Sequence, residues 1–540
     1  MNPRAFSRLA GVGLCLVLAS CGKTAVPSSH TAGMPWAKDY TERHLRIPTP
    51  DGTRLSSSVF MPDAKKFPGK RPVVILGSSW ALNEWEYDGQ ARQFAAAGYV
   101  VLNYAPRGFG LSGGRVGVAA AADIHDVSDL IDWLGANTSA DTNRVAMAGV
   151  SYGAGLGLLA AAHDERIKTV VALSGWGDLI QSLAPNDSPR QVWISLLIGT
   201  GAIFGRLDPD LYKRVDDLFN HHNFEDLRAW ARVRSPLSYV DRLNARQVPI
   251  FVGNSYQDNL FPPSQMREFY DKLTGPKMFY MDRGIHAMTA VPGLFGMPSE
   301  VWFDAHAWID HWLLGKDTDI VRRPPVSFGT DRGREYYNEM PQPSSAESAV
   351  FKLTALNKLV QKESASNEST LPNIVIRLMG NIDSSATSGI PLLSDTADAF
   401  LGLPVLQDMK RIDKNYAAIY LSQPVGSVTS LRGSPRVTIH LQPHQGPVQL
   451  NAYLYDVDDK NIGKLITHGT FTRYEASAIA STIPLELLVA AYDVPAGHRI
   501  AVAIDTRDPL YVNPATAAYQ LEIDHSAHSE TTVALPIVPF

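Results

Sequence analysis

The stretch Gly149-Val150-Ser151-Tyr152-Gly153 decides the fold prediction, because it places a serine where an apolar strand meets an apolar helix. The strand is expected over residues 144–148 and the helix over residues 152–163. A serine in such a tight turn exposes its Oγ, and a glycine on either side leaves room for the strained backbone. The start of the helix also presents free N–H groups and a positive dipole end to a developing oxyanion. The stretch therefore predicts a nucleophilic serine.

Strands and helices alternate from residue 40 to about residue 316, which is typical of an α/β fold with a mostly parallel sheet. Runs such as Pro72-Val73-Val74-Ile75-Leu76-Gly77 have the length of buried strands, and other segments carry apolar residues at helical spacing. The expected strands cover 72–77, 99–104, 144–148, 168–174, 248–253 and 277–281, after a hairpin over 42–62 that turns at Asp51-Gly52. The expected helices cover 85–97, 124–134, 152–163 and 301–312.

Residues 178–246 form an insertion between the strand at Val170 and the strand at Ile250, with helical patterns over 210–219 and 224–233. An insertion at this point of such a sheet would lie over the carboxyl ends of the strands, where long loops often determine specificity. We therefore expect a helical cap above the serine, within an α/β-hydrolase domain of residues 40–318.

The pattern changes after residue 318, where short strands with turn signals dominate. The expected strands cover 436–441, 448–457, 462–472, 483–489, 500–504 and 519–523. They predict a separate C-terminal β-sandwich (jelly-roll) domain over residues 319–540. The run Asp456-Val457-Asp458-Asp459-Lys460 lacks the glycine and the fifth position of a calcium loop, so we interpret it as a hairpin turn.

The composition is that of a globular chain large enough for more than one domain. Of the 540 residues 45% are hydrophobic and 19% charged, and the net charge is −5. Since no basic stripe with interleaved aromatic residues occurs in the sequence, we expect no nucleic-acid partner.

The N-terminus resembles a bacterial lipoprotein signal peptide over residues 1–20. Arg4 and Arg8 precede an apolar segment over 9–19 that is too short for a stable membrane span. That segment leads into Leu18-Ala19-Ser20-Cys21, which is similar to a lipobox, in which the chain is cleaved before the cysteine and lipid is attached to Cys21. An ordinary signal peptide that happens to contain a cysteine is the alternative.

The cysteine content agrees with an anchored chain. Cys15 and Cys21 are the only cysteines, so the expected mature chain has no disulfide. Residues 21–39 would form a flexible tether. The residue after Cys21 is Gly22 and not aspartate, which resembles lipoproteins that are sorted to an outer membrane. We therefore expect an exported, periplasmic protein anchored through Cys21 in the outer membrane.

A base and an acid for Ser151 are expected after two later strands, because the chain order in α/β-hydrolases is serine, acid, histidine. Asp258 follows the strand over 248–253, 107 residues after Ser151. His286 follows the strand over 277–281, 28 residues after Asp258. The sequence therefore predicts a Ser151–His286–Asp258 triad.

Four other residues compete weakly for these two roles. Asp282 lies on the same short loop as His286, and Asp178 follows an earlier strand. His125 and His163 lie on predicted helices, where surface or boundary positions are the simpler interpretation.

The oxyanion site needs two donors. The Tyr152 N–H, directly after the nucleophile, is the first expected donor. The second should come from the loop Gly77-Ser78-Ser79-Trp80, where we favour the Trp80 N–H and keep Ser79 as the alternative. The Trp80 ring could also form a wall of the acyl pocket.

Two further motifs are interpreted as structural, and neither a cofactor nor a metal is expected. Residues 107–114 contain G-x-G-x-x-G after a strand, but a dinucleotide fingerprint would open the first βα unit and start a helix at the glycines. We expect a turn passing beneath Ser151 instead. His221-His222 with Glu225 and Asp226 is a weak metal candidate, since adjacent histidines on a helix point in different directions.

Three groups of residues carry a resemblance to a known family. They are 107–114, 131–134 with 143–153, and the C-terminal runs 422–424, 431–435, 452–457 and 492–499. On these residues the chain resembles the X-prolyl dipeptidyl-peptidase and cocaine-esterase-like (CocE/NonD) hydrolase family. The resemblance spans most of residues 40–525 and implies a serine hydrolase of ester or amide bonds without a cofactor, using Ser151, Asp258, His286 and the Tyr152 amide. One departure is that some family esterases use a tyrosine side chain as the second oxyanion donor, where Ser78-Ser79-Trp80 stands here.

The family leaves the substrate open between acyl esters, X-Pro peptides and α-amino acyl groups. The apolar run over 192–198 in the predicted cap favours an ester of a small or aromatic acyl group. An aminopeptidase would need cap carboxylates to bind the substrate ammonium, and Asp187, Asp208 and Asp210 are available. An X-Pro dipeptidyl-peptidase is the alternative, and a noncatalytic binding lipoprotein is a further one.

Overall fold

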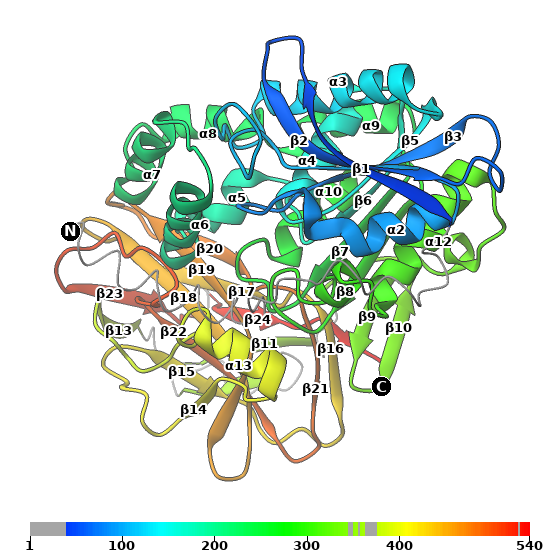
Figure 1. Ribbon diagram of the computed structural model, residues 1–540. Coiled ribbons are helices and arrows are strands. Elements are labelled where there is room, and N and C mark those ends of the chain that lie inside the picture. The colour runs from blue at the N-terminus through cyan, green and yellow to red at the C-terminus, as the bar shows by residue number, and fades with distance from the viewer. Residues whose placement is uncertain (1–38, 344–348, 355–356, 362–374, 527–529) are drawn as a thin grey trace.

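The computed structural model describes residues 39–343, 349–354, 357–361, 375–526 and 530–540 (Figure 1). They form an α/β part built on one large sheet and a β-rich part with three smaller sheets. The predicted signal peptide, Cys15, Cys21 and nearly all of the tether lie outside the described residues. None of the described helices is long and apolar enough to cross a membrane.

Ten strands form the large sheet, in the order β1-β2-β4-β3-β5-β6-β7-β8-β9-β10. The strands from β4 to β9 along this order run parallel, and the predicted leading hairpin β1–β2 pairs antiparallel with β4 at one edge. The bounds are β1 Tyr40–Pro48, β2 Arg54–Pro62, β3 Arg71–Gly77, β4 Val100–Tyr104, β5 Ala140–Val150, β6 Ile167–Leu173, β7 Ile250–Ser255, β8 Lys277–Asp282, β9 Val326–Thr330 and β10 Gly333–Tyr337.

Helices cover both faces of this sheet because successive side chains of a strand point to opposite faces. Val73 and Ile75 of β3 pack in the cluster that includes α3 and α4, whereas Val74 and Leu76 pack with α2 and α12. One layer holds α3 (Ala121–Asn137), α4 (Tyr152–His163), α9 (Val240–Ala245) and α10 (Pro263–Lys272), and the other holds α2 (Asp88–Ala96) and α12 (Glu300–Leu314). The helix predicted over 85–97 is a 3₁₀ turn, η1 (Glu84–Tyr87), followed by α2.

The predicted cap is helical and lies between β6 and β7. Hydrogen bonds join it to loops at the carboxyl ends of β3 and β4. Among them, Trp80 Nε1 donates to Leu197 O, Arg206 N to Gly108 O, and Val116 N to Arg206 O, each at 2.9 Å. Its helices are α5 Leu179–Leu183, η2 Pro185–Asp187, α6 Gln191–Phe204, α7 Asp210–Asn220, α8 Phe224–Arg232 and η3 Pro236–Tyr239.

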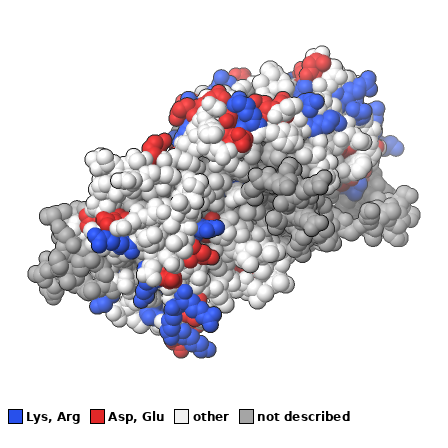
Figure 2. Space-filling model, turned by 90° about the vertical axis from the view of Figure 1, so that its left-hand side faces the viewer, with Lys and Arg blue, Asp and Glu red and all other residues white. Residues whose placement is uncertain are grey.

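Charged side chains of the cap helix α7 form ion pairs within the cap. Arg214 bonds Asp210 at 2.9 Å and also pairs with Asp226, while Lys213 bonds Asp217 at 2.8 Å. On the face of the molecule shown in Figure 2, acidic and basic side chains are interspersed and form no extended area of one sign.

The C-terminal part is the predicted β sandwich. Val437 and Ile439 of one sheet pack in the same buried cluster as Leu450 and Leu454 of another. The seven-stranded sheet contains β11 Val350–Leu353, β12 Leu359–Gln361, β13 Val375–Gly380, β17 Arg436–Leu441, β20 Ser481–Glu486, β23 Tyr519–Asp524 and β24 Thr532–Ala534. The five-stranded sheet contains β14 Leu406–Asp408, β15 Ala418–Leu421, β18 Val448–Val457, β19 Ile462–Arg473 and β22 Arg499–Asp505. A third sheet contains β16 Thr429–Gly433, β21 Ala490–Val494 and β25 Ile537–Val538.

The predicted hairpin turn at residues 456–460 is confirmed. Asp458 Oδ1 accepts the N–H groups of Lys460 and Ile462 at 2.9 and 2.8 Å, between β18 and β19. The shorter helices are α11 (Val291–Leu294), η4 (Asp319–Arg322) and α13 (Leu393–Leu401), the last from the C-terminal part.

The large sheet continues past the boundary predicted at residue 318. β9 adds to β8 in parallel, and β10 adds to β9 as a hairpin, so both belong to the first sheet. The sequence pattern of a short strand does not show which sheet the strand joins. The pairing of β9 with β8 across the predicted boundary therefore could not be predicted from the sequence.

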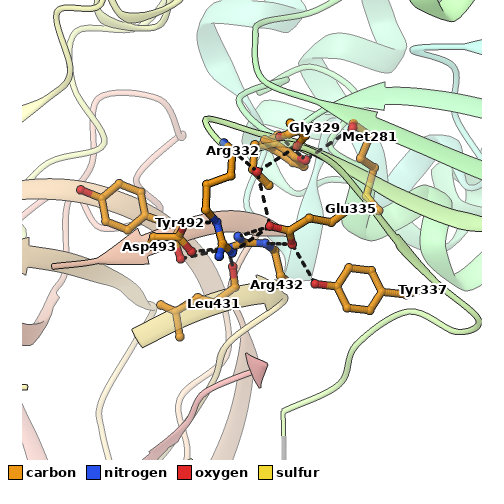
Figure 3. Close-up of polar contacts among 12 residues, drawn as sticks. Met281, Gly329, Arg332, Glu335, Tyr337, Leu431, Arg432, Tyr492 and Asp493 are labelled. Carbon is orange, nitrogen blue, oxygen red and sulfur yellow. Dashed lines mark hydrogen bonds and ion pairs between the residues drawn. The ribbon is translucent and has the colours of Figure 1, made fainter. Parts of the chain in front are cut away.

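A cluster of charged side chains joins β10 to the C-terminal part (Figure 3). Arg432 of β16 is 1% exposed and binds both oxygens of Glu335 at 2.8 and 2.9 Å. Arg432 also pairs with Asp493 of β21 at 2.9 Å, and Tyr337 OH donates to Glu335 at 2.8 Å. Arg332 pairs with both carboxylates from its more exposed position. This set of residues is called the Arg432 junction below.

Candidate active site

Ser151 occupies the tight turn between β5 and α4 that the sequence predicts. Its φ of 56° and ψ of −115° are a backbone conformation that L residues rarely adopt. A Cβ on Gly149 would lie 2.6 Å from the Gly153 carbonyl carbon, and a Cβ on Gly153 would lie 1.9 Å from the Gly77 oxygen. Both glycines are therefore required by close backbone approach, and the Ser151 N–H is fixed by a 2.8 Å bond to Leu173 O.

The structure brings the three predicted triad residues into one hydrogen-bonded chain. His286 Nε2 lies 2.8 Å from Ser151 Oγ, and His286 Nδ1 lies 2.8 Å from Asp258 Oδ2. Since a carboxylate can only accept, Nδ1 carries the proton and Nε2 is free to accept the serine hydroxyl proton. The geometry is that of a nucleophile, a base and an orienting acid.

Asp258 is held in place by its own loop. The side chain is fully buried, and its Oδ1 accepts the N–H groups of Leu260 and Phe261 at 3.0 and 2.8 Å. The second oxygen is left for His286. Because both oxygens are fixed, the carboxylate holds the imidazole in a single orientation.

The competing residues have other partners. Asp282 pairs with Arg334 at 2.8 Å, and Asp178 accepts the N–H groups of Ile180 and Gln181 at the start of α5. His163 Nδ1 lies 2.8 Å from Leu159 O, and His125 is exposed.

Within the part of the chain that the structure describes, the backbone N–H groups of the two predicted oxyanion donors, Trp80 and Tyr152, are free, whereas the N–H of Ser79 is hydrogen-bonded. The Ser79 N–H donates to Glu86 Oε2 at 2.7 Å, so it is not free for a ligand. Among the described residues, no acceptor pairs with the N–H of Trp80 or of Tyr152. The two side chains pack edge to face with ring centroids 5.5 Å apart, which keeps these segments side by side.

The glycine-rich run over 107–114 is a turn against the elbow, as expected. Its Phe109 ring lies 4.9 Å from the Trp80 ring and 6.0 Å from the Tyr152 ring. Arg107 binds both oxygens of Asp126 at 2.6 Å. No helix begins at the glycines, since α3 starts only at Ala121.

The weak metal candidate around His221 is packed against an aromatic ring. The His221 ring stacks on Tyr474 with centroids 3.7 Å apart. Across the part of the chain that the structure describes, no group of three or more His, Cys, Asp or Glu side chains could hold a metal ion.

A pocket opens at Ser151 and extends under the cap, with a cavity volume of about 90 Å³. Aliphatic and aromatic side chains form almost all of its lining, and Arg214 is the single charged residue among them. Asp187, Asp208 and Asp210 are not part of this lining. Residues that line the pocket include Trp80, Trp176, Leu179, Ile198, Trp230 and Phe261.

Two acidic residues of the C-terminal part reach the loop that carries Asp258, which the sequence reasoning missed. Asn259 donates to Asp395 at 2.9 Å, and Gln257 donates to Asp398. Burial, together with the nearby acidic groups, raises the pKa of Asp395 to about 7. Their helix, α13, lies within residues 355–419, a segment without a recognisable motif, so only the spatial arrangement reveals the contact.

Glu86 is the second residue that the sequence did not single out. Its carboxylate binds Ser79 beside Trp80, and burial raises the pKa of Glu86 to about 7 against the opposing effect of the Ser79 hydrogen bonds. A glutamate within a predicted helix carries no signal of such a role.

Comparison with known proteins gives matches along both parts of the chain. The family model of the X-Pro dipeptidyl-peptidase (S15 family) matches residues 51–288, and that of the X-Pro dipeptidyl-peptidase C-terminal non-catalytic domain matches residues 322–535. A putative Xaa-Pro dipeptidyl-peptidase of Streptomyces avermitilis is 21% identical over 519 residues, covering 82% of this chain and 72% of that protein.

Solved structures share the whole architecture at low sequence identity. An α-amino acid ester hydrolase has a TM-score of 0.69 at 15% identity, covering 95% of this chain and 100% of the other. An aminopeptidase of a marine sediment Thaumarchaeota archaeon has a TM-score of 0.70 at 15% identity, covering 96% and 100%. The two family models follow each other along the chain and together span most of residues 51–535, and the chain therefore belongs to the X-Pro dipeptidyl-peptidase (S15) family of serine hydrolases.

Proposed function

We propose that the protein hydrolyses carboxylic esters of uncharged, apolar acyl groups through an acyl-enzyme on Ser151. The observation that carries this proposal is the pocket at Ser151, whose lining is almost entirely aliphatic and aromatic. An ammonium group in such a pocket would lose its hydration without gaining a carboxylate, which is strongly unfavourable. An alkyl or aryl group would instead gain free energy from burial.

The triad supplies the chemistry. His286 Nε2 accepts the Ser151 proton while Oγ attacks the ester carbonyl, and Asp258 stabilises the imidazolium that forms. The oxyanion is bound by the N–H groups of Tyr152 and Trp80. His286 then protonates the leaving alcohol. In the second half-reaction His286 Nε2 accepts a proton from the attacking water and returns it to Ser151 Oγ, which leaves as the carboxylic acid is released.

The cap carboxylates offer little to an aminopeptidase. Asp187 pairs with Arg228, Asp210 pairs with Arg214, and Asp208 Oδ1 accepts the Asp210 N–H at 3.0 Å. None of the three lines the pocket.

An X-Pro dipeptidyl-peptidase is the second candidate, and one observation favours it. Asp395 and Asp398 contact the loop of Asp258 and could attract a substrate ammonium from outside the acyl pocket. In that case Asp395→Asn would raise KM for prolyl amides and leave neutral esters unaffected.

A direct test compares substrates on the fragment that starts at Lys23. A graded series of nitrophenyl esters is assayed beside Ala-Pro and Gly-Pro nitroanilides, with Ser151→Ala and, as a matched control, Ser57→Ala of strand β2. We expect ester turnover that increases with acyl length up to the size of the pocket, loss of about 10⁵-fold or more in Ser151→Ala, and no change in Ser57→Ala. Prolyl amide turnover with silent esters would reject the ester proposal, and activity in Ser151→Ala would reject the triad.

We further propose that the enzyme is exported to the periplasm and anchored in the outer membrane by lipid at Cys21. The support is the signal-like segment over 1–20 with Leu18-Ala19-Ser20-Cys21. Cys21→Ser should release the protein from the membrane fraction, while Cys15→Ser, inside the cleaved segment, should not. A membrane-bound Cys21→Ser variant would overturn the anchor.

A further inference from the structure

Glu86 makes two short hydrogen bonds to one residue of the oxyanion loop. Its Oε2 accepts the Ser79 N–H at 2.7 Å, and its Oε1 accepts the Ser79 hydroxyl at 2.6 Å. The Ser79 hydroxyl also lies 3.1 Å from the oxygen of Val150, the residue before Ser151. Both carboxylate oxygens are thus used on a single loop residue next to the nucleophile.

The loop is fixed on each side of the free Trp80 amide. Before it, Ser78 donates its N–H and its hydroxyl to Tyr104 O at 3.0 and 2.9 Å. After it, the Trp80 indole N–H donates to Leu197 O in the cap. Between these two anchors, the bonds from Ser79 to Glu86 determine how the peptide unit before Trp80 is oriented.

The same short helix also holds the strand that ends at Ser151. The Val150 N–H donates to the hydroxyl of Tyr87 at 2.7 Å, next to Glu86 in η1. Residues 86 and 87 therefore fix the oxyanion loop and the elbow relative to each other. This is the relation that two oxyanion donors, one from each segment, require.

A carboxylate at position 86 is unfavourable for the stability of the fold. No lysine, arginine or histidine forms an ion pair with it among the described residues, and burial raises its pKa to about 7. A neutral side chain could join the same segments without this desolvation, and such perturbed carboxyl groups cluster at functional sites.

We propose that Glu86 is a positioning residue of the oxyanion site, whose carboxylate holds Ser79 so that the Trp80 N–H is directed at the oxyanion formed on Ser151. This inference rests on the proposed function. Glu86 itself does not touch the substrate. It acts only through the backbone of the loop, so its effect should appear in the transition state and not in substrate binding.

The test compares Glu86→Gln with Glu84→Gln. Glu84 is a buried residue of the same 3₁₀ turn, but its carboxylate accepts the Ser56 hydroxyl at 2.6 Å. A glutamine at position 86 can accept only one of the two Ser79 donors. The probes are a nitrophenyl ester of an apolar acid and an alkyl trifluoromethyl ketone, which adds to the serine as a tetrahedral oxyanion.

We expect Glu86→Gln to lower kcat by about 10- to 100-fold with little change in KM, and to weaken trifluoromethyl ketone binding by a similar factor. Glu84→Gln should leave all three quantities near their wild-type values. If Glu86→Gln does not fold, Ser79→Ala removes the hydroxyl contact alone and should lower kcat by a smaller factor with KM unchanged.

Three results would overturn the inference: an unchanged kcat in both Glu86→Gln and Ser79→Ala, a change in KM that accounts for the loss, or equal effects of Glu84→Gln and Glu86→Gln. Failure of the proposed function looks different. It would appear as ester hydrolysis that persists in Ser151→Ala, whatever the Glu86 variants do.

Discussion

The pocket at Ser151 and the Arg432 junction are both buried, but they are filled by opposite chemistry. The pocket is lined by aliphatic and aromatic groups with space left between them. The junction is filled by an arginine and two carboxylates, with their charges paired at 2.8 to 2.9 Å. One region is empty and almost uncharged, and the other is full and charged.

The difference separates function from assembly. An empty apolar cavity contributes little to stability, since its lining lacks contacts on one side, so it is explained by a ligand. A buried ion pair is weak evidence for stability, but removing one partner leaves an unpaired charge that is strongly destabilising. Changes in the pocket should therefore alter turnover, and changes in the junction should alter unfolding.

The largest effect is expected from the loss of the Asp258 carboxylate, which orients His286 beside the pocket. Asp258→Asn should lower kcat by about 10⁴-fold, because the amide favours the wrong tautomer of His286. Asp282→Asn, the competing acid paired with Arg334, should leave kcat near wild type. Steady-state kinetics on an apolar ester measures both, and equal losses in the two variants would contradict the assignment of the acid.

Next in size is the loss of the central cation of the junction. Arg432→Met should reduce the free energy of unfolding by about 3 kcal/mol, because Glu335 and Asp493 are left without their partner. Its kcat at 25 °C should not change. Arg436→Met, a half-exposed residue whose nitrogen lies 3.8 Å from Glu486, is the control for denaturant unfolding. A drop in kcat without a drop in stability would link the junction to catalysis instead.

A charge placed in the pocket should reduce turnover by a smaller factor. Ile198→Asp puts a carboxylate into the lining and should lower kcat/KM for the preferred apolar ester by about 10- to 100-fold. Ile203→Asp is the matched control, since Ile203 lies on the same helix and is 63% exposed. Higher activity of Ile198→Asp on α-amino acyl esters would sharpen the comparison, and an unchanged ester profile would show that acyl groups bind elsewhere.

The smallest effect concerns the acid side of the junction. The hydrogen bonds from Arg432 lower the pKa of Glu335 to about 2, below its usual value near 4.5. Its contribution to stability is fully present above pH 4.5 and is lost as the pH falls from there towards 2, by an amount of about 2 kcal/mol. Glu335→Gln should flatten this part of the stability profile in thermal unfolding from pH 6 to 3. A profile as steep as that of the wild type would assign the acid sensitivity to other carboxylates.

The sequence was sufficient to predict that Ser151, Asp258 and His286 lie together, because each follows a recognisable apolar strand. Gly149 and Gly153 mark the close approach directly, and Asp258 and His286 occupy the loops that the chain order requires. At these residues the local sequence pattern alone indicates the position in space.

Elsewhere the position depends on contacts between distant segments. Glu86 accepts a hydrogen bond from Ser79 across a turn, and Asp395 of the C-terminal part accepts one from Asn259. Strand β9 joins the large sheet although it follows the predicted domain boundary. No local periodicity reports which side chain faces which, so hydrogen-bond partners of this kind require the three-dimensional structure.

The central claim is an acyl-enzyme on Ser151 formed within an apolar pocket. The most direct measurement is intact and peptide mass spectrometry after rapid acid quench of the enzyme with a nitrophenyl ester of an apolar acid. We expect a mass increase equal to that of the acyl group, located on the peptide that carries Ser151 and absent from Ser151→Ala. An adduct on another residue, or the same adduct in Ser151→Ala, would contradict it.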